Sequence, residues 1–112
     1  MIEVLKSKIH RAVVTDANIN YEGSITISTD LMKLVGLCEY QKVLVVDINN
    51  GQRFETYVIE STDRNVICLN GAAARLVTVG DRVIIMAFNF VDSVPENYKP
   101  KIIVLDENNE VV

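Results

Sequence analysis

Short apolar runs separated by turn residues recur along the chain, and this spacing restricts the fold more than any other feature. Residues 42–48 and 53–60 are two such runs, and the Asn-Asn-Gly sequence between them is typical of a tight hairpin turn. Similar runs lie at residues 24–28, 66–69, 82–88 and 101–107. The regular strand-helix alternation of a parallel doubly wound sheet is absent. We therefore predict a mainly β fold, closed or nearly closed as a barrel.

Helical signals are few and brief. Ser28 or Thr29 is suited to cap a helix of about two turns that ends at Gly36. The alanines of residues 70–76 fit one helical turn, and residues 93–100, which carry two prolines, fit a capped turn or a loop. A few short helices should therefore accompany the strands.

The two ends of the chain carry different patterns. In residues 5–10 apolar or small side chains alternate with charged ones, which puts Lys6, Lys8 and His10 on one face of a strand. Residues 15–23 are polar and predict turns. Near the C-terminus the pairs Asn-Asn and Val-Val suggest a loose tail.

Composition limits the classes of function. The 112 residues suit one domain, residues 1–112, and the 49% apolar fraction can fill a single core. A net charge of −4, with no block of Lys or Arg, argues against nucleic acid as a partner. No apolar run approaches the length of a membrane span, and no long apolar secretory signal opens the sequence. These features predict a cytoplasmic protein that contacts no membrane.

Cysteine and histidine offer little for metal chemistry. Cys38 and Cys68 form no CxxC pair, so we interpret them as reduced, buried, small hydrophobic residues. With His10 as the single histidine, the usual zinc ligand sets cannot be assembled, and no metal is expected. A cysteine nucleophile activated by His10 remains an alternative, without a supporting motif.

Several polar segments are ordinary when each is taken alone. Gly23 followed by Ser24 is usually a turn that leads into a strand, and Asn70 followed by Gly71 is usually a turn. Arg53 and Tyr57 are four positions apart, so in a strand they share a face and could simply point to solvent. Only the order of these segments along one chain changes the interpretation.

In that order the chain resembles the pyruvoyl-dependent aspartate 1-decarboxylase family. The matching segments are SKIHRA at 7–12, TDANINYEGS at 15–24, NNGQRFETY at 49–57, NGAAA at 70–74 and VGDRVII at 79–85. They cover about residues 1–90. The resemblance implies a small double-psi β-barrel that assembles as a homotetramer with active sites between subunits.

The resemblance also implies self-cleavage between Gly23 and Ser24, into a short chain of residues 1–23 and a long chain of residues 24–112. Ser24 would become a covalent pyruvoyl cofactor, which forms a Schiff base with L-aspartate. The implied product is β-alanine, released with CO₂, for pantothenate and coenzyme A biosynthesis. Some relatives need a maturation factor, so one is a possible partner.

Roles carry over from the family to matching positions. Tyr57 is implied as proton donor, and Arg53 and Lys8 as cations for the two substrate carboxylates. The remaining implied substrate contacts are Thr56, Gly71, Ala72 and Ala73, and the implied supporting groups are Asn70, His10 and Tyr21. In a regular strand Thr56 and Tyr57 point to opposite faces. We therefore expect either an irregular strand or one residue that serves a neighbouring subunit.

Two other interpretations remain open from the residues alone. One is a non-catalytic barrel that binds or assembles with a partner, and the other is a cysteine-dependent enzyme. Both predict that the bond between Gly23 and Ser24 stays intact.

Overall fold

The computed structural model describes residues 1–112 and is mainly β. The strands are β1 (Ile2–Val13), β2 (Asp16–Asn18), β3 (Ser24–Ser28), β4 (Lys42–Asp47), β5 (Arg53–Ser61), β6 (Ile67–Asn70), β7 (Arg82–Val91) and β8 (Lys101–Val104). One α-helix, α1 (Thr29–Val35), and one 3-10 helix, η1 (Gly71–Leu76), complete the chain. No helix has the length and apolar character needed to cross a membrane.

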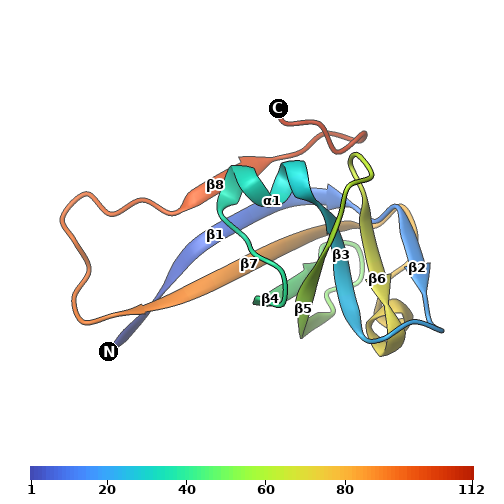
Figure 1. Cartoon of the computed structure of the whole chain (residues 1–112), viewed down its shortest axis with the longest axis horizontal. Helices are drawn as coiled ribbons and strands as arrows, with labels where there is room; N and C mark the ends of the chain where they lie inside the picture. Colours follow the sequence, from blue (N-terminus) through green and yellow to red (C-terminus); the bar gives the residue numbers. More distant parts are fainter.

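The strands form a ring. Their hydrogen-bonded order is β2-β6-β3-β5-β4-β7-β1-β8. Only Val14 and Thr15 separate β1 from β2, so one continuous segment pairs with β7 at its start and with β6 at its end (Figure 1). The Val14 N–H donates to the Asp81 carbonyl and the Thr15 N–H to the Ile67 carbonyl, which joins the two sides. The predicted mainly β barrel is confirmed.

Alternating side chains of the strands fill the barrel. Ile25 and Ile27 of β3, Val45 of β4 and Val58 of β5 are fully buried, and their neighbours in sequence point to the other face. Helix α1 begins after Ser28 and ends at Gly36, as the capping signals predict, and buries its apolar side against the barrel. The core therefore holds the strand that begins at Ser24 in a fixed register.

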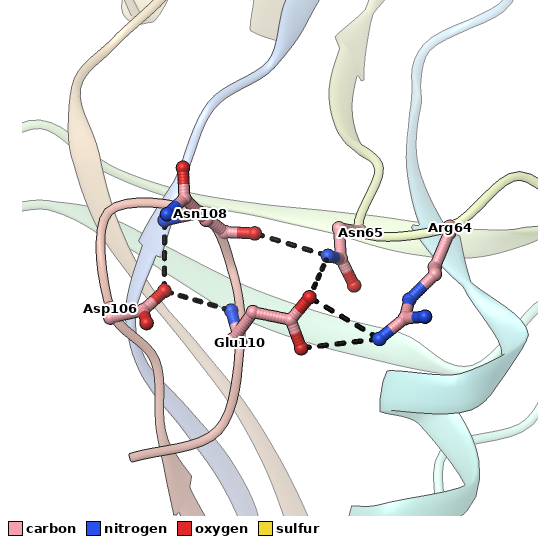
Figure 2. Close-up of polar contacts among 5 residues, drawn as sticks. All are labelled: Arg64, Asn65, Asp106, Asn108 and Glu110. Atoms are coloured by element: carbon pink, nitrogen blue, oxygen red, sulfur yellow. Dashed lines mark hydrogen bonds and ion pairs between the residues drawn. The ribbon is translucent and has the colours of Figure 1, made fainter.

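The prediction of a loose C-terminal tail is wrong. Asn109 is 1% exposed, and its side chain accepts from the Val13 N–H at 2.7 Å and donates to the Val13 carbonyl at 2.9 Å. Figure 2 shows other contacts of the same C-terminal segment, in which the Glu110 carboxylate forms an ion pair with Arg64 and accepts a hydrogen bond from the Asn65 amide. The polar C-terminal residues are ordered because the groups that they contact supply matching hydrogen-bond donors and acceptors.

Residues 16–18 also differ from the prediction, because they form β2 rather than a turn. The strand pairs in parallel with β6, with Asp16 opposite Cys68 and Asn18 opposite Asn70. Ladder hydrogen bonds use backbone groups, so a polar sequence can pair when the neighbouring strand presents a free edge. This pairing brings the segment before Ser24 close to the end of β6.

Strands β1 and β7 extend past the barrel as a two-stranded ribbon (Figure 1). Phe88 and Phe90 of β7 are 40% and 59% exposed, and Ile2 of β1 is 46% exposed. A cavity of about 330 Å³ lies at this ribbon and is lined by Glu3, Lys42, Val43, Leu44, Glu55, Phe88 and Phe90. An apolar surface of this kind is typical of a contact with another chain.

Candidate active site

Ser24 lies at the start of β3, where the chain passes from an exposed loop into the barrel. Gly23 is exposed, whereas Ser24 is fully buried and pairs with Asn70 in the antiparallel ladder to β6. The Ser24 hydroxyl donates to the Glu22 carbonyl at 2.9 Å and accepts from the Asn70 side-chain N–H at 2.9 Å. Both polar roles of this hydroxyl are therefore fixed by its neighbours.

Asn70 is the centre of a short polar network. Its amide nitrogen also donates to the Thr26 hydroxyl at 2.9 Å, and its amide oxygen accepts from the Cys68 thiol at 3.2 Å. These side chains share the face of the sheet that points away from the core, because Ile25 and Leu69 between them are buried in the barrel. Thr26 was not among the predicted site residues, although the alternation along β3 puts its side chain on the same face as that of Ser24.

Gly71 holds the segment before Ser24 in place. Its backbone is left-handed, with φ +66°, and a Cβ built on it would lie 2.7 Å from the Gly23 Cα and 2.9 Å from the Tyr21 carbonyl oxygen. Only glycine permits this approach. Gly71 is the first residue of η1, which continues with exposed Ala72 and half-buried Ala73, so this helix begins against the residue before Ser24.

Strand β5 puts Tyr57 beside Ser24. The parallel pairing begins with Ile25 opposite Val58. Ser24 and Tyr57 directly precede these two residues in their strands, so they lie at the same end of the pairing. The ladder between β4 and β5 is regular here, so Thr56 points toward the core side and Tyr57 toward the face of Ser24. No strand irregularity is present at these two residues.

The surroundings of Tyr57 are open and charged. A cavity of about 330 Å³ beside it is lined by Lys42, Glu55, Thr56 and Tyr57. Lys42 forms an ion pair with Glu55 at 3.2 Å between exposed side chains. The Tyr57 ring also faces Tyr40, with 6.1 Å between the ring centroids.

Arg53, Lys8 and His10 do not join this cluster within one chain. Arg53 is exposed, lies opposite Val46 at the start of β5, and makes no ion pair. Across the sheet, Lys8 of β1 pairs with Met86 of β7, Met86 pairs with Leu44 of β4, and Leu44 pairs with Glu55 of β5. Three strand spacings of about 4.8 Å separate the ends of this row of paired residues, so Lys8 stands roughly 14 Å from β5.

His10 and the cysteines show no nucleophilic arrangement. His10 is half-buried, its Nδ1 has no partner, and burial, with the charges of Lys8 and Arg11, lowers its pKa. Cys38 is exposed and contacts Gln41, so the prediction that both cysteines are buried is wrong. Burial, with the charge of Asp16, raises the pKa of the half-buried Cys68 thiol, which keeps it protonated rather than nucleophilic.

Fold and site together define a small β-barrel protein in which a buried serine follows an exposed glycine beneath a glycine-alanine turn. The aspartate decarboxylase family model matches residues 1–112, which includes the C-terminal residues that the sequence motifs left out. The chain belongs to the aspartate decarboxylase family.

Relatives with the name aspartate 1-decarboxylase are similar along nearly the whole chain. The protein of Caldicellulosiruptor saccharolyticus is 60% identical over 100% of this chain and 89% of its own length. Those of Thermoanaerobacter pseudethanolicus and Campylobacter jejuni are 55% and 54% identical over 97% and 96% of this chain, and over 95% and 86% of their own lengths.

Among solved structures, the chain is similar to two designed proteins, msDPBB_sym2 and mkDPBB_sym1. Sequence identity is 19% and 17%, and each comparison has a TM-score of 0.46 over 75% of this chain and 96% of the designed one.

Proposed function

We propose that this chain decarboxylates L-aspartate to β-alanine and CO₂ after it cleaves its own backbone between Gly23 and Ser24. The observation that carries the proposal is the geometry of Ser24, a fully buried serine whose oxygen accepts a hydrogen bond from Asn70. Gly23, the residue before it, lies against Gly71. The chain belongs to the aspartate decarboxylase family, and this membership supports decarboxylation of aspartate as the reaction of this site. The proposed setting is cytoplasmic synthesis of pantothenate.

The cleavage balances with one water molecule. The Ser24 oxygen attacks the Gly23 carbonyl carbon, the C–N bond breaks, and the nitrogen takes the hydroxyl proton, which leaves an ester. Loss of the Ser24 Cα proton then breaks the Cβ–O bond and releases the carboxylate of Gly23. Water replaces the nitrogen, ammonia leaves, and the new terminus at position 24 is a pyruvoyl group. The products are residues 1–23 and residues 24–112.

Neighbouring residues suit the first step. An N–H donor stabilises negative charge on an oxygen, so the Asn70 amide favours loss of the proton from Ser24. Gly23 has no side chain to obstruct the approach of the Ser24 oxygen to the Gly23 carbonyl carbon. The site is therefore built around a backbone bond rather than around a catalytic dyad.

When formed, the pyruvoyl group supplies an electrophilic carbonyl and an electron sink for decarboxylation. Tyr57, beside position 24, is suited to deliver a proton from its hydroxyl to the carbon that loses CO₂. Gly71, Ala72 and Ala73 have no side chain or a small one, so the substrate could approach their backbone closely. Thr56 points toward the core side of β5, and the strand is regular there, so we propose that Thr56 contacts the substrate in the site of a neighbouring subunit.

Substrate carboxylates need cations that are free to bind them. Arg53 and Lys8 make no ion pair within the chain, and the Arg53 guanidinium can hold a carboxylate with two hydrogen bonds. Because Lys8 stands across the sheet from β5, we propose that Lys8 and His10 serve the site of another subunit in a homotetramer. Exposed Phe88 and Phe90 offer an apolar contact surface for such an assembly. Tyr21 would line the shared site.

Intact mass spectrometry of the purified protein tests this proposal. We expect fragments of residues 1–23 and 24–112, with a pyruvoyl terminus on the larger, and β-alanine from L-aspartate. Ser24→Ala should abolish both results. Ser28→Ala is the matched control, because Ser28 is a buried serine of the same strand whose hydroxyl has no partner, and this variant should cleave normally.

An uncleaved chain, after incubation with extract of its own cells as a source of any maturation factor, would refute the proposal. Production of β-alanine by the Ser24→Ala variant would refute the pyruvoyl mechanism. If the protein were a non-catalytic barrel, the chain would stay uncleaved. If it were a cysteine-dependent enzyme, substitution of Cys38 or Cys68 would abolish the activity and substitution of Ser24 would not.

A further inference from the structure

The Cys68 thiol is placed to control the orientation of the Asn70 amide. Its sulfur lies 3.2 Å from the Asn70 Oδ1, while the Nδ2 at the other end of the amide donates to Ser24 and Thr26 at 2.9 Å each. Cys68 and Asn70 are two residues apart in β6, so both point away from the core. The amide therefore lies between a thiol on one side and two hydroxyls on the other.

The two ends of the Asn70 amide differ in hydrogen bonding, so the orientation of the amide decides whether Ser24 receives or donates a hydrogen bond. The oxygen only accepts hydrogen bonds and the NH₂ group only donates them. Hydroxyls of Ser24 and Thr26 can act either way, so they do not by themselves choose which end faces them. A protonated thiol can donate to the amide oxygen, whereas its sulfur is only a weak acceptor for the NH₂ group, so the thiol favours the oxygen. A thiol with its ordinary pKa is already protonated at neutral pH, and burial raises the pKa of Cys68 further.

The orientation of the Asn70 amide decides which hydrogen bonds the Ser24 hydroxyl makes. With Nδ2 toward it, the Ser24 oxygen accepts from Asn70, and its own proton is directed to the Glu22 carbonyl. With the amide reversed, the Ser24 proton would point to an amide oxygen, and no donor would stabilise charge on the attacking oxygen. The first arrangement favours attack on Gly23 and the second opposes it.

We propose that Cys68 is a positioning residue for backbone cleavage, which holds the Asn70 amide with its N–H toward Ser24. This inference rests on the proposed function, because it assigns Cys68 a part in the self-cleavage of that same site. Cys68 touches no reacting atom, and it acts only through Asn70.

The test measures the rate at which full-length chain becomes residues 24–112, by intact mass at successive times after purification. Cys68→Ala and Cys68→Val remove the donor, the second with side-chain bulk retained, and both should cleave roughly two- to tenfold more slowly, the effect of one neutral hydrogen bond. Cys68→Ser keeps a donor and should cleave at close to the wild-type rate. Cys38→Ala is the control, because Cys38 also contacts an amide oxygen, that of Gln41, but outside the site.

Thermal melting of the same variants separates positioning from folding. The proposal is supported if Cys68→Ser cleaves at the wild-type rate, Cys68→Ala and Cys68→Val cleave more slowly, and all three variants melt at the same temperature. A loss of packing would not make the cleavage rate depend on whether residue 68 can donate a hydrogen bond. Wild-type cleavage rates in both Cys68→Ala and Cys68→Val would overturn it and leave the proposed function intact. A wild-type chain that never cleaves would overturn both.

Discussion

Gly71 and Gly23 approach each other backbone to backbone, although they are 48 positions apart in the chain: a Cβ added to Gly71 would lie 2.7 Å from the Cα and the N of Gly23. Neither partner is a flexible side-chain end that could move aside. The contact fixes the residue that carries the carbonyl which Ser24 is proposed to attack.

Gly71→Ala should therefore slow cleavage strongly and lower stability. The left-handed backbone alone costs a non-glycine residue about 1–2 kcal/mol, and the contact with Gly23 adds to this cost. Gly51→Ala is the matched control, because Gly51 also has a positive φ, +77°, but has open space around it. Cleavage by mass and unfolding by urea would measure the difference. Equal behaviour of the two variants would contradict a role for this contact.

Tyr57→Phe should separate cleavage from decarboxylation. The substitution removes the proposed proton donor and keeps the ring, so the chain should still form residues 24–112. Its kcat for β-alanine should fall by about 100-fold or more, the usual contribution of a positioned acid. Tyr40→Phe, at the ring that faces Tyr57, is the control and should stay active. Retention of full kcat by Tyr57→Phe would require another donor.

Co-expression of two defective chains tests the shared site. Lys8→Ala retains Ser24 but lacks a substrate cation, whereas Ser24→Ala retains Lys8 but cannot form the pyruvoyl group. If Lys8 serves another subunit, mixed assemblies should regain part of the activity that each variant lacks alone. Affinity tags of two kinds would isolate mixed assemblies. No recovery in isolated mixed assemblies would place Lys8 and Ser24 in the same chain's site.

Asp47 should make the stability depend on pH. Burial, together with the neighbouring Asp81, raises the pKa of this carboxyl from 3.8 to about 6. The folded chain thus holds a proton that the unfolded chain releases, and this contribution is complete below about pH 4 and is lost as the pH rises through about 6. Asp47→Asn cannot ionise, so we expect it to flatten this slope and to add about 1–3 kcal/mol at pH 7.

Urea unfolding at pH 4 to 8 would measure the slope for Asp47. Asp92→Asn is the control, because Asp92 is exposed. If the stability of the wild-type chain changed between pH 4 and pH 7 in the same way as that of Asp47→Asn, the assignment would be contradicted.

Asn109→Ala should destabilise the fold more than its position near the C-terminus suggests. The change leaves the N–H and carbonyl of Val13 without partners, at a cost of about 2–3 kcal/mol in the free energy of unfolding. Glu110→Gln, in the exposed contact with Arg64 of Figure 2, should cost under about 1 kcal/mol. Denaturant unfolding of both variants would decide between a docked and a loose C-terminus.

The sequence by itself determined the local features of this protein. Alternating β-branched residues predicted the strands around the core, and the helix ends at Gly36 as its stop signal predicts. Period-2 alternation already placed Arg53 and Tyr57 on one face of a strand. These results depend on residues near each other in the chain, where propensity and period act.

Only the tertiary structure decided which distant residues meet. Pairing of β3 with β5 and β6 brings Tyr57 and Asn70 to the same end of the barrel as Ser24, and it decides that Cys68 lies on the face of Ser24 rather than in the core. The polar segments at Asp16 and Asn109 became ordered because distant backbone groups offered matching partners. No local pattern encodes such pairings, because hydrogen bonds between distant segments depend on the register of strands that the whole barrel must satisfy together.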